Sequence, residues 1–220
     1  MMKVVIIVIV FGLIFAACSS SEETSKIITD SITKPTINTV TKNELDSKQV
    51  IYNHNYDNMD RGNHDLEGQV VIDLKYYNEH AISRGDIVYF TNPETKKNLG
   101  EYSISRVIGL PGEKVKIEKG QIYINGKMLD AFYGRAHRLG ADLDSLKKAL
   151  ERVDLEDYIR KNIENIANYF EELTMKEIEI PEDSIYIVGD DWFRSNDSRF
   201  FGPLPTDKIE GKVVGVIGSP

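Results

Sequence analysis

The residues of this chain that could do chemistry are hydroxyls, carboxylates and imidazoles, and few of them have an evident partner. Ser105 stands directly before Arg106, yet none of the four histidines is close to it in sequence: His54, His64, His80 and His137. A serine hydroxyl becomes a nucleophile when an adjacent base takes its proton. Ser105 could therefore act only if the fold brings a base beside it, and the sequence shows none.

Two groups of charged residues have simple interpretations. Asp197 and Arg199 are two positions apart, so an extended segment places both side chains on one face and allows an ion pair, which at an exposed site contributes only about 0–1 kcal/mol. Five possible metal ligands crowd one short stretch: His54, Asp57, Asp60, His64 and Asp65. Three or four would have to converge on a metal. A polar loop is the simpler interpretation, and we expect no metal and no other cofactor.

The composition is that of a folded, acidic protein. The chain has 220 residues, of which 41% are hydrophobic and 28% charged, and its formal net charge is −8. These proportions are typical of globular rather than disordered proteins. The acidic balance argues against nucleic acid as a partner, and the single cysteine excludes an intrachain disulfide.

The first eighteen residues, MMKVVIIVIVFGLIFAAC, resemble the signal of a bacterial lipoprotein. Lys3 precedes an apolar run over residues 4–15, which is shorter than the roughly 20 residues of a comfortable membrane span. Small residues precede Cys18 as in a lipobox, with Phe15 at the position usually held by leucine. The resemblance implies removal of residues 1–17 and lipid on Cys18, which would anchor the protein at the outer face of the cytoplasmic membrane. An uncleaved anchor with an incidental cysteine is the alternative.

The pattern then changes twice along the chain. Residues 18–48 are rich in Ser, Thr, Asp and Lys without an apolar period, which predicts a flexible tether. Over residues 49–220, short β-like runs alternate with turns: 69–74, 86–90, 113–129, 184–190 and 212–218. Within the third run, Asn125 and Gly126 predict a type I′ hairpin turn. Short strands at this spacing predict a mainly β domain built as a coiled sheet or barrel.

Residues 142–175 break the β pattern. Apolar side chains recur there at helical spacing, from Leu143 through Leu146 to Leu173, and Asp154 is a suitable N-cap for a second helix. The segment therefore predicts a two-helix insertion that packs on the sheet through its apolar stripe.

Three blocks together resemble the successive conserved boxes of bacterial type I signal peptidases. They are RGDIVYF (84–90), RVIGLPGEKV to GQIYINGKML (106–129), and GDDWFRSNDSRFFGPLP (189–205), and they occur in the family's order. The resemblance implies a mainly β, membrane-associated serine endopeptidase that removes signal peptides from exported proteins. It also implies a serine–lysine dyad, in which a lysine of lowered pKa accepts the proton of the serine hydroxyl.

This sequence departs from the family at both dyad positions. The register of RVIGLPG places Ser105 where the family has its lysine. The stretch DNMDRGN (57–63) keeps the family's methionine as Met59 and places Asn58 at the serine position. A competing stretch, ITKPTI (32–37), offers the family's Pro-Thr but lies far upstream of Arg84, and we adopt the first alignment.

The other family positions carry over with one exception, Asp191, which replaces an asparagine. Ser195 corresponds to the serine that orients the lysine in active members, and Asp197 and Arg199 correspond to a structural ion pair. The supporting positions that match are Met59, Arg106, Gly189, Asp190, Ser195, Asp197, Ser198 and Arg199.

These residues predict a signal-peptidase-like protein without an intact catalytic pair. An asparagine amide is a poor nucleophile, and a serine hydroxyl is no general base near neutral pH. We expect an inactive, membrane-tethered module that binds an extended peptide or a segment of an exported protein by strand addition, near Met59 and the strand before Arg106. One alternative is an active serine endopeptidase with an unorthodox or misaligned dyad. Another is a structural scaffold that docks a partner through the helical insertion.

Overall fold

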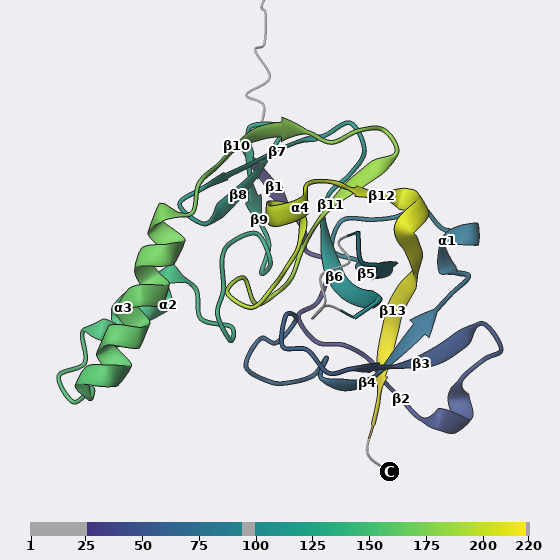
Figure 1. Ribbon diagram of the computed structural model, residues 1–220, viewed down its shortest axis with the longest axis horizontal. Coiled ribbons are helices and arrows are strands. Elements are labelled where there is room, and N and C mark those ends of the chain that lie inside the picture. The colour runs from purple at the N-terminus through teal and green to yellow at the C-terminus, as the bar shows by residue number, and fades with distance from the viewer. Residues whose placement is uncertain (1–25, 94–99, 219–220) are drawn as a thin grey trace, which may run out of the picture.

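The computed structural model describes residues 26–93 and 100–218, which form a mainly β structure with few helices (Figure 1). The strands are β1 (Ile27–Thr29), β2 (Thr39–Val40), β3 (Gln49–His54), β4 (Gly68–Asp73), β5 (Ile87–Thr91), β6 (Tyr102–Gly109), β7 (Lys114–Glu118), β8 (Gln121–Ile124), β9 (Lys127–Asp130), β10 (Met175–Glu179), β11 (Ser184–Val188), β12 (Leu204–Pro205) and β13 (Ile209–Ile217). The helices are α1 (Tyr76–Glu79), α2 (Leu143–Leu150), α3 (Asp157–Glu172) and α4 (Ser198–Phe201), and 3₁₀ turns occupy Lys42–Glu44 and Thr206–Lys208.

The strands form two sheets, and the larger one is curled. Its order is β12-β11-β6-β5-β13-β4-β3, with β2 paired to β13, whereas the smaller sheet has the order β1-β9-β8-β7-β10. The pairing register of β13 shifts against both of its long neighbours. The shift lies between Val213 and Gly215 where β13 pairs with β4, and between Ile209 and Gly211 where it pairs with β5. Bulges of this kind bend a strand and increase its twist. The predicted mainly β, coiled-sheet fold is confirmed.

The smaller sheet follows the alternation of the sequence closely. Val115 and Ile117 of β7 pair with Ile124 and Ile122 of β8, and all four side chains are fully buried. The β8–β9 turn has φ values of 50° at Asn125 and 74° at Gly126. Positive φ at both central residues is what a type I′ turn requires, so this prediction is confirmed.

The two-helix insertion is present as α2 and α3, but only one end of it packs on a sheet. Phe170 and Ile166 of α3, with Leu146 of α2, join the buried cluster over the smaller sheet. The other end extends away from the body (Figure 1), and there Val153 is 98% and Tyr158 70% exposed. The predicted packing on the sheet therefore holds for one end of the hairpin.

The predicted N-cap of the second helix is wrong. Helix α3 begins at Asp157 after Glu156, while Asp154 is bound by Arg152 at 2.7 Å. An aspartate caps a helix by accepting from backbone N–H groups of the first turn. Asp154 stands too far before that turn, whereas Asp142 caps α2 by accepting from Ser145 N at 2.9 Å.

The prediction of a flexible tether over 18–48 is wrong for residues 26–48. Strand β1 pairs in parallel with β9, and β2 pairs in parallel with β13, so this segment connects the two sheets. Between these strands Asp30 accepts a hydrogen bond from Tyr133 Oη at 2.5 Å, and Thr33 lies against Gly85. The polar side chains that indicated a linker instead satisfy buried partners. The signal-like segment and Cys18 lie outside the described residues.

No helix within residues 26–93 and 100–218 is both long and apolar enough to cross a membrane.

We predict that Phe170→Ala lowers the free energy of unfolding by about 3–5 kcal/mol, because the ring is fully buried between α3 and the smaller sheet. Tyr158→Ala on the exposed face of the same helix is the matched control, with an expected change within about 0.5 kcal/mol. Urea denaturation measures both. Equal effects of the two substitutions would contradict the packing of α3.

Candidate functional site

Asn58, the residue at the predicted nucleophile position, is buried and held at both ends of its side chain. Its Nδ2 donates to the carbonyl oxygen of Ile104 at 2.8 Å, and its Oδ1 lies 2.9 Å from His54 Nε2. Its backbone carbonyl accepts from Ser195 Oγ at 3.0 Å and from Asp191 N at 2.9 Å. The amide thus occupies a fixed position between the end of β3 and the middle of β6.

Ser105, at the predicted base position, lies on β6 opposite Val88 of β5. It is 1% exposed, and its Oγ has no hydrogen-bond partner within the described part of the chain. Asn58 contacts the backbone of the residue just before it, so the structure brings the two positions to neighbouring sites without a hydrogen bond between their side chains. Among residues 26–93 and 100–218, no base forms a hydrogen bond with this hydroxyl.

The block that starts at Gly189 closes the site from the side of β11. Ser195 Oγ donates to the backbone of this region, with acceptors at Asn58 O (3.0 Å) and Asp191 O (2.5 Å). A Cβ on Gly189 would stand 1.9 Å from Ser195 Oγ and 2.6 Å from Asn58 O. Only glycine fits there, because a side chain would push apart Asn58 and Ser195.

Two buried ion pairs hold this block in place. Arg106 binds Asp190 through two hydrogen bonds of 2.7 and 2.6 Å, with both side chains at most 4% exposed, and also donates to Gly85 O at 2.8 Å. Asp197 binds Arg199 at 2.8 and 2.9 Å and accepts from Gly189 N at 3.0 Å. The second pair was expected from the sequence. The first joins residues 84 positions apart, so no local signal could reveal it.

Asp191, which replaces the asparagine of the family pattern, has a compensating partner. Its Oδ2 accepts from Arg138 Nη1 at 2.5 Å and from Leu139 N at 3.3 Å. Burial raises the pKa of Asp191, and Arg138 opposes that shift. The extra carboxylate therefore fastens the loop before α2 to the site.

One edge of β6 has no strand partner beside Asn58. Val107 N donates to Asp86 O and Val107 O accepts from Gly85 N, so the odd-numbered residues of β6 turn their polar backbone groups toward β5. The backbone polar groups of Tyr102 and Ile104 point to the opposite edge of β6. Strand β11 pairs with that edge only from Arg106 onward. Two side chains donate to the carbonyls on this edge: Tyr52 Oη donates to Tyr102 O at 3.0 Å, and Asn58 Nδ2 donates to the buried Ile104 O.

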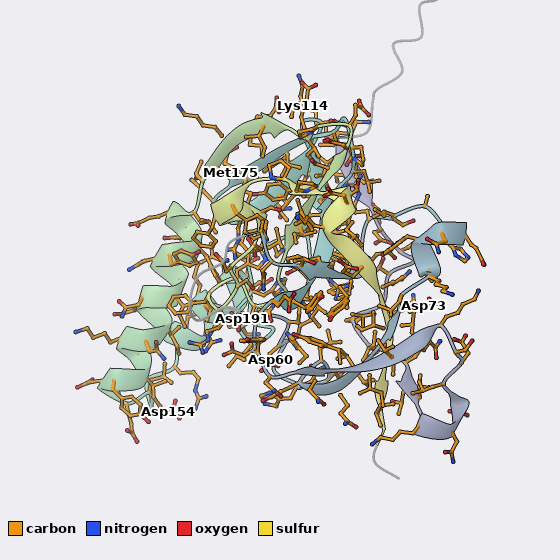
Figure 2. All side chains as sticks on the ribbon, turned by 45° about the vertical axis from the view of Figure 1, so that its right-hand side comes forward. Asp60, Asp73, Lys114, Asp154, Met175 and Asp191 are labelled. Atoms are coloured by element: carbon orange, nitrogen blue, oxygen red, sulfur yellow. The ribbon has the colours of Figure 1, made fainter. Side chains whose placement is uncertain are left out.

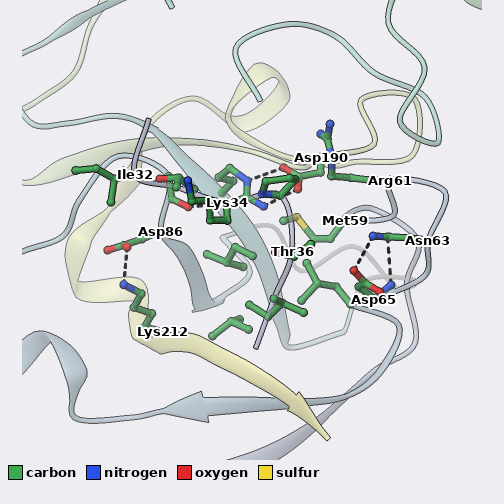
Figure 3. A pocket seen from close by; sticks show the side chains of 18 residues that line it. Ile32, Lys34, Thr36, Met59, Arg61, Asn63, Asp65, Asp86, Asp190 and Lys212 are labelled. Atoms are coloured by element: carbon green, nitrogen blue, oxygen red, sulfur yellow. Dashed lines mark hydrogen bonds and ion pairs between the residues drawn. The ribbon is translucent and has the colours of Figure 1, made fainter. Parts of the chain in front are cut away.

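Two pockets flank this region. A polar pocket of about 70 Å³ is lined by Asn58, Ser103 and Arg194, together with Tyr56, Asp57, Asn92, Gly100 and Asn196. A larger pocket of about 250 Å³ is lined by Met59, by the Arg106–Asp190 pair and by residues 32–37 (Figure 3). Consecutive residues Asn58 and Met59 thus serve different pockets. The ITKPTI stretch lines the larger pocket, which does not include Asn58.

The five clustered acids and histidines do not converge. His54 binds Leu66 O and Asn58, whereas His64 binds Asp60 at 2.8 Å. Within the described residues, no group of three or more potential ligands is placed to hold a metal ion. Figure 2 shows the side chains of the described residues on the ribbon, with Asp60 and Asp191 among those labelled.

A family model for "Signal peptidase, peptidase S26" matches residues 2–217 of this chain. The chain belongs to that family. It is 27% identical over 152 residues to a probable signal peptidase I-2 of Synechocystis, covering 67% of this chain and 53% of the relative. It is 31% identical over 141 residues to signal peptidase I V of Bacillus subtilis, covering 62% of this chain and 65% of the relative.

The chain thus spans between about half and two thirds of these two relatives, and signal peptidase I homologues are membrane-associated in general. A solved signal peptidase I from Enterococcus faecalis is 26% identical, with a TM-score of 0.38, covering 61% of this chain and 97% of the other.

We predict that Asp190→Asn destabilises the protein by about 3–5 kcal/mol, because it leaves the Arg106 guanidinium buried without a counter-charge. Asp154→Asn breaks the exposed pair with Arg152 and is the matched control, with an expected change below about 1 kcal/mol. Chemical denaturation measures both variants. A small effect of Asp190→Asn would show that the buried pair does not hold the site together.

Proposed function

We propose that this signal-peptidase-like protein is catalytically inactive and binds an extended peptide along the free edge of β6. The observation that carries the proposal is the residue type and the hydrogen bonding of Asn58. An amide that donates to Ile104 O and faces His54 has replaced the hydroxyl nucleophile, and the hydroxyl of Ser105 has replaced the amine. The members of a catalytic unit act together, so losing both removes the acylation chemistry.

The free edge of β6 supports the binding part of the proposal. Tyr102 and Ile104 point their backbone polar groups to the edge opposite β5, and among the described residues the side chains of Tyr52 and Asn58 donate to the two carbonyls. An extended peptide could exchange these two side-chain contacts for backbone hydrogen bonds, as in other cases of strand addition. The polar pocket next to Ser103 would receive one of its side chains.

The proposed location fits such a ligand. Lipid on Cys18 would hold the domain at the outer face of the bacterial cytoplasmic membrane, where segments of exported proteins emerge in extended form. The connection from the membrane would be short, because the chain is already folded against β9 at Ile27.

A second candidate function is a scaffold that docks a partner through the helical insertion. The observation in its favour is the exposure of Val153 and Tyr158 at the projecting end of α2 and α3. The inner face of the hairpin, with Leu146 and Phe170, is occupied by packing on the smaller sheet. A docking role would therefore fall to the tip.

We predict that the purified full-length chain in detergent does not cleave a signal-peptide substrate, since neither position carries a competent group. The double variant Asn58→Ser/Ser105→Lys is expected to gain traces of cleavage, because Asn58 contacts the residue adjacent to Ser105. Mass spectrometry of the products measures both, and Asn58→Ser alone is the control. Cleavage by the wild type that is abolished in Asn58→Ala or Ser105→Ala would favour the active alternative and overturn the proposal.

We further expect a fluorescent extended peptide to bind saturably, as measured by anisotropy. Ser103→Trp should weaken binding by about tenfold because it fills the pocket beside the free edge. Lys114→Trp, on an exposed position of the smaller sheet, is the control and should have no effect. Equal affinities of the two variants would place the peptide elsewhere.

A further inference from the structure

A continuous chain of polar contacts leads from Leu66 to the free edge of β6. His54 Nδ1 lies 2.7 Å from Leu66 O, and His54 Nε2 lies 2.9 Å from Asn58 Oδ1. Asn58 Nδ2 then lies 2.8 Å from Ile104 O. All three contacts are buried, so water does not substitute for a missing partner without a rearrangement.

The number of protons on His54 decides how many of these contacts are hydrogen bonds. Both ends of the chain are backbone carbonyls, which only accept. Leu66 O therefore needs a proton on Nδ1, and Ile104 O needs the NH₂ group of Asn58. The amide oxygen then faces Nε2, which must carry a proton as well. Only the doubly protonated imidazolium satisfies all three contacts.

A neutral imidazole leaves one contact between two acceptors. With its proton on Nδ1, the ring keeps the short bond to Leu66 O, and the Nε2 lone pair faces Asn58 Oδ1. Turning the NH₂ group of Asn58 toward Nε2 removes the repulsion at the ring and transfers it to the Ile104 carbonyl. That rotation removes the donor from Ile104 O and presents an oxygen to it instead.

We propose that His54 is a proton-controlled latch on the free edge of β6: the imidazolium holds Asn58 on the Ile104 carbonyl, and the neutral ring releases that carbonyl to an extended peptide. This inference rests on the proposed peptide-binding function, because the latch would regulate that binding. No other described contact covers Ile104 O, so the state of one imidazole decides access to that acceptor.

The surroundings of His54 set the pH range. The ring is fully buried, and burial lowers the pKa of His54 below its ordinary value of 6.5. Two carboxylates oppose this shift: Asp57, which Arg194 binds at 2.6 Å, and Glu67, on the loop before β4. The other titratable neighbours are two tyrosines, Tyr52 and Tyr56, with ring centroids at 6.2 and 5.9 Å. β6 contributes the uncharged Ile104. The edge is thus released near neutral pH and covered in acid.

The latch itself is tested without peptide. In the full-length chain in detergent micelles, ¹⁵N NMR follows the His54 ring nitrogens and the Asn58 side-chain NH₂ from about pH 8 to about pH 4. We expect the NH₂ signals to shift together with the titration of His54, and to do so unchanged in His80→Gln, an exposed histidine of the same chain. Asn58 signals that stay constant while His54 titrates would overturn the latch whether or not a peptide binds.

The effect on binding is tested with the fluorescent peptide and two opposite variants. We expect the wild type and His80→Gln to bind about tenfold more tightly at pH 8 than at pH 5. His54→Gln keeps a permanent N–H donor toward Asn58 and should bind weakly at both pH values. Asn58→Ala removes the cover and should bind tightly at both.

The outcomes separate the two proposals. A pH dependence in Asn58→Ala equal to that of the wild type would overturn gating by His54. Absence of binding in every variant would overturn the peptide-binding function and with it the gating role, while the NMR titration still decides whether His54 controls Asn58.

Discussion

The buried pair of Arg106 and Asp190 is the interaction on which the site depends. It joins β6 to the turn after β11, and through a third hydrogen bond it also holds the backbone of Gly85. The turn that it fixes presents Ser195 to the carbonyl of Asn58. A buried ion pair contributes little net stability, but losing one partner is strongly unfavourable. Its effect is therefore to specify one arrangement of three distant segments.

Within this frame lie the two predicted dyad positions, Asn58 and Ser105. Gly189 and Ser195 lie in close contact, and Ser195 Oγ donates to the carbonyl of Asn58. Asn58, at the predicted nucleophile position, contacts a buried polar partner at both ends of its amide: His54 Nε2 at Oδ1 and Ile104 O at Nδ2. In the proposed function this amide covers the edge of β6, and burial lowers the pKa of the His54 imidazole beside it.

The sequence predicted local structure well where one rule dominated. Alternation in β7 and β8 and the Asn125–Gly126 turn fixed a hairpin, because period and turn chemistry agree there. It failed where polar residues have long-range partners. Residues 26–48 look like a linker, yet Asp30 accepts from Tyr133 and Thr33 lies close against Gly85, and nothing local to the segment indicates those contacts. Asp154 was misplaced as a cap for a related reason, since a nearby arginine takes its carboxylate.

By itself, the sequence determined that the chain is mainly β and which family it resembles, and it predicted that Asn58 and Ser105 stand at the two dyad positions. Those conclusions rest on residue types and short spacings, which the chain carries in one dimension. Only the tertiary structure decided what surrounds the two positions. It placed His54 and Ile104 on either side of Asn58, it gave Ser105 Oγ no hydrogen-bond partner among the described residues, and it paired Arg106 with Asp190. Such contacts arise from the curl of a sheet around distant segments, and no local pattern encodes them.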